Sequence, residues 1–241
     1  MQGKVAKEIV IFTSTPNEYR SVSDHVGRVA FENLVCSVLE CGPGRINASF
    51  FVAKELTPRL SGQNQQIIMV GAGTSGSLSM SLKQGEVIVS NSAIISDWRM
   101  EDGNEVTVSP YGWFDYRPAE PYHIQKMAID CQDPLIIRLM EQLPSQSLKK
   151  GRFLTSEAFV VGKENKLNKG TIFDCLACDM ESGVYGFIGS RLLNLPWFNI
   201  RVVADTLDED LGDYFAKERD MTQILGQKIV ETLQLLDSLL Y

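Results

Sequence analysis

The sequence predicts an α/β fold. Short apolar runs typical of buried strands alternate along the chain with amphipathic stretches typical of helices. The chain has 241 residues, 44% of them hydrophobic, which is long and apolar enough to form one large core. No internal repeat, low-complexity tract or Gly/Ser linker divides it. We therefore expect residues 1–241 to form a single domain.

Four runs of β-branched and apolar residues predict buried strands. Each run is short and is bounded by turn residues, as expected for strands that are covered on both faces. The four runs are residues 8–13, 66–71, 85–93 and 198–204.

Three helices are predicted by capping residues and by the spacing of apolar side chains. Asn47 is a candidate N-cap for a helix that runs to Leu60. Asp133 followed by Pro134 gives a cap and a favourable first position for a second helix. Residues 214–240 carry leucine and isoleucine at helical spacing, which predicts a long amphipathic helix packed on the sheet.

The charge balance argues against nucleic acid as a partner. The chain has 23 Lys and Arg against 30 Asp and Glu, a net charge of −7, so no overall positive field would attract phosphate. No apolar stretch approaches the roughly 20 residues of a transmembrane helix. The N-terminal residues also lack the apolar region of a secretory signal. We expect a cytoplasmic protein that does not bind membranes.

The five cysteines fit reduced thiols better than a disulfide framework, because their number is odd and the chain is long. Cys175 and Cys178 have the spacing of half a zinc ribbon or of a redox pair. No second pair of this kind occurs, and neither His25 nor His123 has ligand spacing to it. We interpret the pair as core residues.

The longest irregular region, Ser96–His123, is acidic and rich in aromatic residues. Loops of this length in compact proteins are often lids or binding loops, and its tryptophans and tyrosines could stack on a ligand. Subunit contact or surface packing explains the same composition equally well.

Two glycine-rich segments follow predicted strands. Gly71–Leu78 has three glycines and three hydroxyl side chains, so its amides could closely approach an anion or a sugar. It matches neither a Walker loop nor a dinucleotide-binding turn. Cys41–Ala48 joins a strand to a helix and could bring helix N-terminal amides to the same end of the sheet. Together, the two segments predict a pocket.

Three carboxylates stand next to apolar strands. Glu18 follows the first strand, Glu181 follows Asp179 and Met180, and Asp205 ends the last strand. Burial near strand ends raises carboxyl pKa values toward those useful in acid–base catalysis. A lone carboxylate there is often a cap or a surface ion pair, but three together indicate a catalytic site.

The order and spacing of several motifs resemble the nucleoside phosphorylase and nucleosidase superfamily over nearly the whole chain. Within it, the sequence is most similar to the methylthioadenosine/adenosylhomocysteine nucleosidases. That resemblance implies a three-layer α/β/α domain with a mixed central sheet. The motifs are Gly42-x-Gly-Arg-Ile-Asn-Ala, Gly73-Thr-Ser-Gly, Gly85-Glu-Val-Ile-Val-Ser, Thr155-Ser-Glu-Ala-Phe, Asp179-Met-Glu-Ser and Arg201-Val-Val-Ala-Asp.

The resemblance also assigns roles in cleaving the N-glycosidic bond of a purine nucleoside. Asp205 would be the general acid at N7 of the base, and Glu181 with Met180 would hold the ribose. Glu18, helped by Arg201, would orient the attacking water. Such a division is chemically coherent, because an oxocarbenium-like sugar needs an activated leaving group on one face and a positioned nucleophile on the other.

The remaining substrate contacts are expected from neighbouring residues. Phe159 would stack on the base and the Val160 backbone would read its edge. Thr74 and Gly76 of the glycine-rich segment are further candidates for substrate binding, as is Glu157. Glu157 stands where the family commonly has Asp, and Ala204 stands where it often has Ser, so the identity of the base and of the 5′ group stays open.

Two alternatives remain. A purine nucleoside phosphorylase would need positive charge to bind phosphate. Hexameric phosphorylases place an arginine shortly before the glycine-rich loop, and in this sequence Gly71 occupies that position. Arg20, Arg28 or Arg45 could replace it. The other alternative is a non-catalytic nucleoside-binding protein, against which the presence of all three carboxylates argues.

The resemblance further implies a homo-oligomer, with a dimer favoured and a hexamer possible. It implies no metal or organic cofactor, because leaving-group protonation and water attack require none.

Overall fold

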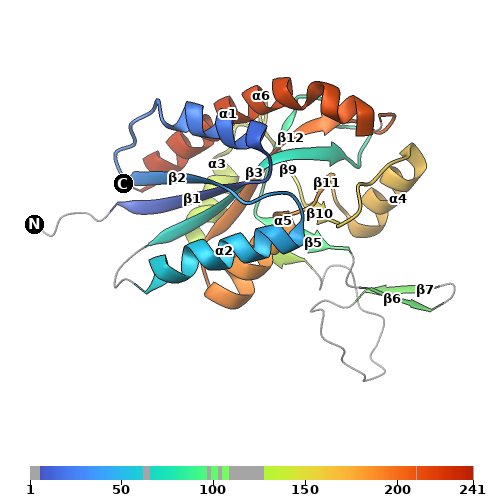
Figure 1. Ribbon diagram of the computed structural model, residues 1–241, viewed down its shortest axis with the longest axis horizontal. Coiled ribbons are helices and arrows are strands. Elements are labelled where there is room, and N and C mark those ends of the chain that lie inside the picture. The colour runs from blue at the N-terminus through green and yellow to red at the C-terminus, as the bar shows by residue number, and fades with distance from the viewer. Residues whose placement is uncertain are drawn as a thin grey trace, which may run out of the picture.

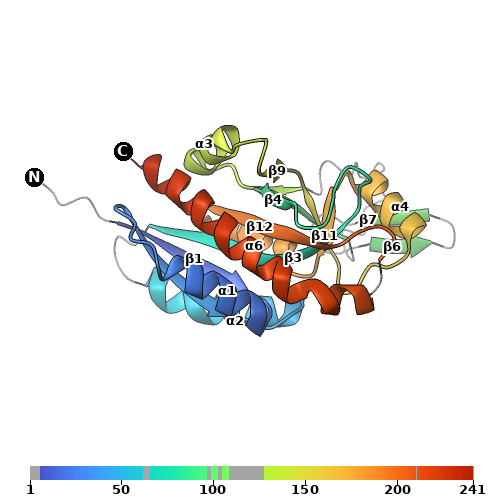
Figure 2. The ribbon, with the colours of Figure 1, turned by 90° about the horizontal axis from the view of Figure 1, so that it is seen from above.

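The computed structural model describes residues 6–61, 66–96, 99–102, 105–108, 128–209 and 211–240. Its centre is a ten-stranded sheet covered by helices on both faces (Figure 1). Helices α1 (Pro16–Val26) and α6 (Leu211–Ser238) cover one face, and α2 (Arg45–Leu60) and α5 (Ser182–Phe187) cover the other. Seen from above, α6 crosses the sheet diagonally (Figure 2). The predicted three-layer α/β fold is confirmed.

The sheet is mixed, as the family resemblance implies. Strand β3 (Ile67–Ser77) is central: it pairs in parallel with β1 (Lys7–Thr13) and β12 (Trp197–Asp205), and antiparallel with β11 (Ala177–Asp179). Around them lie the other strands of the sheet: β2 (Leu34–Glu40), β4 (Val87–Ser90), β5 (Ser92–Ile95), β8 (Ile129–Asp130), β9 (Lys149–Lys150) and β10 (Phe153–Thr155).

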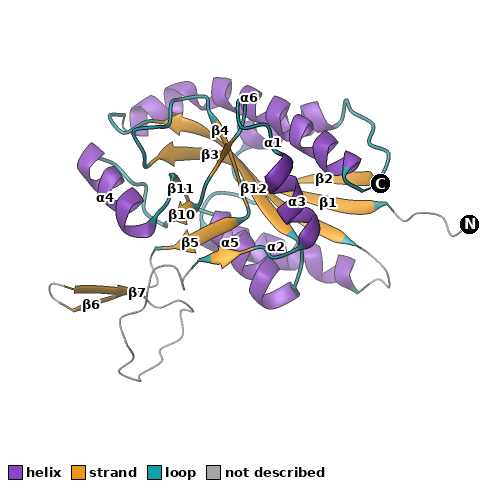
Figure 3. Ribbon diagram, turned by 180° about the vertical axis from the view of Figure 1, so that it is seen from behind, coloured by secondary structure: helices purple, strands orange, loops and turns teal. Residues whose placement is uncertain are grey.

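Helix α3 (Pro134–Gln142), helix α4 (Lys163–Phe173) and a π-helical segment, Ile188–Leu193, complete the described helices. Helix α4 lies near β10 and β11, at the end of the molecule opposite the start of β1 (Figure 3). Among the described residues, no helix is long and apolar enough to cross a membrane.

The predicted strands at residues 8–13 and 198–204 are confirmed as β1 and β12. The predicted strand at 85–93 is wrong in its extent, because the chain breaks near Asn91 into β4 and β5, which pair with different neighbours. The expectation that a strand ends at Gly71 is also wrong. Strand β3 continues through the glycine-rich segment to Ser77.

The predicted helices are present, and two of them start earlier than predicted: α2 at Arg45, and α6 at Leu211 instead of residue 214. Asp133 caps α3 by accepting hydrogen bonds from the amides of Leu135 and Ile136. Helix α2 begins at Arg45, two residues before the expected cap, with Gly44 as its N-cap. The side chain of Asn47 instead donates to the carbonyl of Pro43. The long C-terminal helix is α6.

Most of the Ser96–His123 region lies outside the described residues. The structure describes two short strands within it, β6 (Arg99–Asp102) and β7 (Glu105–Val108), which pair antiparallel as a separate hairpin. That part of the region was expected to be irregular.

The core lies between the sheet and its two helical layers. All eleven residues of β3 and all nine of β12 are buried. Strands buried on both faces are expected in a sheet that helices cover on both sides. The polar side chains of these two strands are therefore enclosed, and they need partners inside the protein.

Candidate active site

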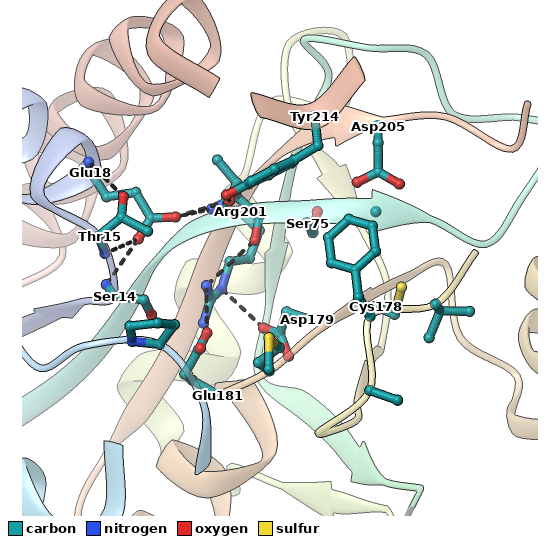
Figure 4. Close-up of a pocket in the computed structure, with 17 residues that line it drawn as sticks. Ser14, Thr15, Glu18, Ser75, Cys178, Asp179, Glu181, Arg201, Asp205 and Tyr214 are labelled. Atoms are coloured by element: carbon teal, nitrogen blue, oxygen red, sulfur yellow. Dashed lines mark hydrogen bonds and ion pairs between the residues drawn. The ribbon is translucent and has the colours of Figure 1, made fainter. Parts of the chain in front are cut away.

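A pocket lies where β3, β11 and β12 end (Figure 4). The start of α1, the loop before α4 and the start of α6 complete its wall. The residues that line it are Ser14, Thr15, Glu18, Pro43, Thr74, Ser75, Gly76, Ala158, Phe159, Val160, Cys178, Asp179, Met180, Glu181, Arg201, Asp205 and Tyr214.

The glycines of β3 make room for the charged side chains of the pocket. A Cβ atom at Gly73 would clash with the guanidinium of Arg201 and lie 2.8 Å from Glu18 Oε1. A Cβ at Gly76 would lie 2.9 Å from Asp205 Oδ2. Real Cβ atoms do not come this close to other heavy atoms, so these positions need glycine. The glycines therefore act through close packing inside a strand, not through a turn.

Glu18 is buried at the start of α1, where it completes a capping box with Thr15. Its Oε2 accepts from the amides of Ser14 and Thr15, at 2.9 and 3.0 Å. Its Oε1 accepts from the amide and the hydroxyl of Thr74, at 2.7 and 2.9 Å. Four donors from two elements thus fix both carboxylate oxygens against the pocket wall.

Arg201 lies between two carboxylates under the pocket. Its Nε is 3.0 Å from Asp179 Oδ2 and its Nη1 is 3.2 Å from Glu181 Oε2. Glu181 Oε1 also accepts from the amide of Gly44 at 2.8 Å, so the second glycine-rich segment does reach this end of the sheet. Burial raises the pKa of Glu181 to about 7, and the neighbouring guanidinium opposes part of that rise.

Asp205, the last residue of β12, forms a different kind of pair. Its Oδ2 is 2.7 Å from the Nζ of Lys166, and both side chains are buried. Burial raises the pKa of Asp205, while the hydrogen bond and the charge of Lys166 lower it. In Figure 4, Asp205 lies on the side of the pocket away from Glu18 and Glu181.

Two aromatic rings contribute apolar surface to the pocket. Phe159 and Tyr214 meet edge to face, with ring centroids 5.7 Å apart. The hydroxyl of Tyr214 is 3.0 Å from the Oγ1 of Thr74, which links α6 to β3. A planar ligand could therefore contact aromatic carbon and carboxylate oxygen in the same pocket.

Three buried polar atoms of the pocket residues lack a hydrogen-bond partner among the described residues. They are the hydroxyl of Ser14 and the Nε and Nη2 of Arg201, of which Nε is held by its ion pair with Asp179. Buried polar groups are nearly always satisfied in folded proteins. The Ser14 hydroxyl and the Arg201 Nη2 are therefore available to a polar ligand or to water.

The structure brings nine of the ten predicted site residues together in this pocket: Glu18, Thr74, Gly76, Phe159, Val160, Met180, Glu181, Arg201 and Asp205. Glu157 is not among the lining residues. Its carboxylate is half exposed and pairs with Arg45 at 2.7 Å. Of the described residues that line the pocket, Arg201 is the only lysine or arginine, so Arg20, Arg28 and Arg45 do not reach it.

Sequence reasoning missed several residues of the site. Asp179 stood inside a recognised motif, but nothing distinguished its carboxylate as the partner of Arg201. Lys166 lies on a helix whose neighbouring residues are mostly exposed, and no spacing relates it to Asp205. The sequence pattern identifies Tyr214 only as the start of the predicted C-terminal helix. Each contact depends on elements that are distant in sequence.

The described residues contain no group of three His, Cys, Asp or Glu side chains that could hold a metal ion. Cys178 lines the pocket, and burial raises its pKa to about 12, which keeps the thiol protonated and unreactive near neutral pH. Cys175 is also a buried, free thiol.

The mixed sheet and the pocket at its strand ends define an α/β protein with a candidate ligand site where strands terminate. The chain belongs to the phosphorylase superfamily, whose sequence profile it matches over residues 3–235. Comparison with curated proteins finds no significant match.

Several solved structures share the fold. Against 5′-methylthioadenosine/S-adenosyl homocysteine nucleosidase from Helicobacter pylori, the TM-score is 0.74 at 18% identity, covering 95% of this chain and 98% of that one. Against futalosine hydrolase from the same organism, it is 0.74 at 19% identity, covering 95% and 97%. Against S-adenosylhomocysteine nucleosidase from Streptococcus pyogenes, it is 0.72 at 18% identity, covering 95% and 97%. The predicted resemblance to this group is confirmed at the level of fold.

Proposed function

We propose that this protein is a nucleosidase that hydrolyses the N-glycosidic bond of a purine nucleoside. One observation carries the proposal: a single pocket holds an acidic residue on one side, Asp205, and two carboxylates, Glu18 and Glu181, on the other. Cleavage of a nucleoside needs this separation, because the base must gain a proton while positive charge develops on the sugar.

In the proposed reaction, the purine lies against Phe159 with its N7 at Asp205, and the Val160 backbone reads the edge of the base. The bond between C1′ and N9 breaks with its electron pair passing to the purine. The proton of the Asp205 carboxyl passes to N7, which makes the purine a neutral leaving group. Burial supports this role, since it raises the pKa of Asp205.

The ribose lies over Met180, with its hydroxyls donating to Glu181. The negative charge of Glu181 and Glu18 stabilises the oxocarbenium-like sugar. Water adds to C1′ from the Glu18 side and loses a proton to solvent. The unpartnered hydroxyl of Ser14 and the Nη2 of Arg201 are the buried groups available to hold this water or a sugar hydroxyl.

The charges that line the pocket favour water over phosphate as the nucleophile. Four carboxylates, Glu18, Asp179, Glu181 and Asp205, line it together with one arginine. That arginine already pairs with two of the carboxylates. Phosphate binding needs fixed positive charge and free donors, and a pocket with an excess of carboxylates repels it.

Base release from 5′-methylthioadenosine, adenosine and inosine tests the proposal. Each nucleoside is assayed in phosphate-free buffer and again with added phosphate. We expect release without phosphate. Release only with phosphate would establish a phosphorylase, and tight purine binding without any turnover would establish a binding protein. The three nucleosides also separate preferences for a 6-amino base and for a 5′-alkylthio group.

We further propose that the protein is cytoplasmic, acts as a homo-oligomer and uses no cofactor. The sequence resemblance supports the homo-oligomer, and leaving-group protonation and water attack require no cofactor.

A further inference from the structure

Lys166 is a fully buried lysine on a helix whose neighbouring residues face solvent. Lys163, Glu164 and Asn165 just before it are exposed, whereas the Lys166 side chain has 0% exposure. A lysine is almost never fully buried unless its charge is paired, because removing an ammonium group from water is costly. Its position therefore has to be explained by what it contacts.

All three donor positions of the ammonium group are taken. The Nζ of Lys166 donates to Asp205 Oδ2 at 2.7 Å, to the carbonyl of Thr206 at 2.5 Å and to the carbonyl of Glu209 at 3.2 Å. An ammonium group has three N–H bonds and no more. Lys166 thus has no donor left for a substrate, and it acts on the pocket through Asp205.

The same contacts orient the Asp205 carboxyl. Among the described residues, Lys166 is the one side chain that donates to it, and it does so at Oδ2. The two carbonyl contacts hold the segment that follows β12, so the lysine ties this segment and the carboxyl to one point on α4. Oδ1 is left for the base.

We propose that Lys166 is the positioning residue of the general acid: it fixes the Asp205 carboxyl by Oδ2 and stabilises the carboxylate that remains after the proton has passed to the purine. This inference rests on the proposed function. In the proton transfer, Asp205 loses a proton and the purine gains it at N7. The new carboxylate then faces the ammonium group of Lys166, which keeps all its protons throughout.

The charges around Asp205 support this assignment. Lys166 from α4 is the cation in contact with it. Glu209, in the segment after β12, and Cys178, the middle residue of β11, also face it. Glu209 raises the pKa of Asp205 by its negative charge and is itself bonded to Lys217. Removal of Lys166 would leave burial and Glu209 to act alone, so the pKa of Asp205 would rise further.

The test is Lys166→Met with Lys163→Met as the matched control. Lys163 lies one turn earlier on α4 and pairs with Asp208, which is exposed. We expect K166M to lower kcat by about tenfold or more with little change in KM, because the carboxylate formed in the reaction loses its cation. K163M should match the parent protein.

Adding K166M to an Asp205→Asn protein should have little further effect, since the lysine acts through that carboxyl.

A carbon-13 NMR titration of aspartate-labelled protein measures the pKa of Asp205 without any substrate, with D205N identifying its resonance. We expect K166M to raise this pKa by about one unit or more. An unchanged pKa, or a kcat close to that of the parent, would overturn the inference.

If K166M does not fold, the same two measurements are made on Lys166→Gln. Failure of both variants to fold would assign Lys166 a purely structural role and overturn the inference. A parent protein that cleaves no nucleoside would refute the proposed function, while the titration would still judge the pairing.

Discussion

The two sides of the pocket hold their carboxylates in different ways. On the proposed sugar side, Glu18 accepts four hydrogen bonds and Glu181 is fixed by Arg201 and by the amide of Gly44. On the proposed base side, Asp205 depends on one side chain, Lys166. The partners of Glu18 and Glu181 lie on two strands, β3 and β12, and at the starts of α1 and α2, whereas the contact of Asp205 joins the end of β12 to α4.

This difference teaches what kind of group holds each buried carboxylate. The donors to Glu18 and Glu181 are amides, a hydroxyl and a guanidinium, none of which gives up a proton near neutral pH. Asp205 faces one cation in a buried site: burial and the charge of Glu209 raise its pKa, and the hydrogen bond and charge of Lys166 lower it. The sugar side is built to stabilise positive charge, and the base side is built to give up a proton.

Replacing Asp205 has the largest expected effect. We expect Asp205→Asn to lower kcat by about 10² or more, because general-acid catalysis is lost while the shape of the side chain is kept. Steady-state kinetics with the best substrate measure the effect, and circular dichroism checks the fold. Near-normal turnover in a folded D205N protein would show that Asp205 is not the general acid. The proposed difference in role between the two sides of the pocket would then be wrong.

Filling the space at Gly73 should disturb the sugar side alone. A Cβ there would clash with Arg201 and approach Glu18, so Gly73→Ala must displace one of two buried charged groups. We expect the free energy of unfolding to fall by roughly 1–3 kcal/mol, with weaker nucleoside binding. Gly27→Ala is the control, since Gly27 ends α1 with an ordinary helical φ of −66°. Urea unfolding of both variants measures the difference, and equal stability would show that the strand adjusts freely.

Gly73 also shows what could be predicted from the sequence. The positions of β1 and β12, the capping of α3 by Asp133 and the gathering of three carboxylates all follow from local patterns and from motif order. The sequence predicts that the strand ends where the glycine-rich segment begins, because glycine usually marks a turn or loop. In the structure this segment is a buried strand, and its glycines are required by side chains of β12 and α1. This requirement comes from tertiary packing, which cannot be predicted from a local sequence pattern.

The pairing of Lys166 with Asp205 was hidden for the same reason. The two residues are 39 positions apart, and one faces inward from a largely exposed helix. The Glu181 site was easier to anticipate, because the resemblance supplied its motif and the second glycine-rich segment was expected at the same end of the sheet. Motif order thus located the strand-borne residues of the site, whereas the contact between α4 and the end of β12 required the folded chain.

The pH dependence should report on Glu181. Burial raises its pKa to about 7, so its carboxylate gains a proton as the pH falls below that value. The anion is the form that accepts from ribose and stabilises the sugar cation. We therefore expect kcat/KM to fall about tenfold per pH unit below pH 7. In a Glu181→Gln protein, activity at pH 8 should be lower and this acid-side decline should be absent. A decline that persists in E181Q would belong to another group.

The smallest effect is expected at Glu157, which the family pattern places among the substrate contacts. In the structure its carboxylate lies outside the pocket lining and pairs with Arg45 at the start of α2. A half-exposed ion pair contributes at most about 1 kcal/mol, because solvent screens it. We therefore expect Glu157→Gln to change kcat/KM less than about threefold for every nucleoside. A larger loss for 6-amino purines than for inosine would show that Glu157 leaves Arg45 to read the base, and would add a fourth carboxylate to the three compared above.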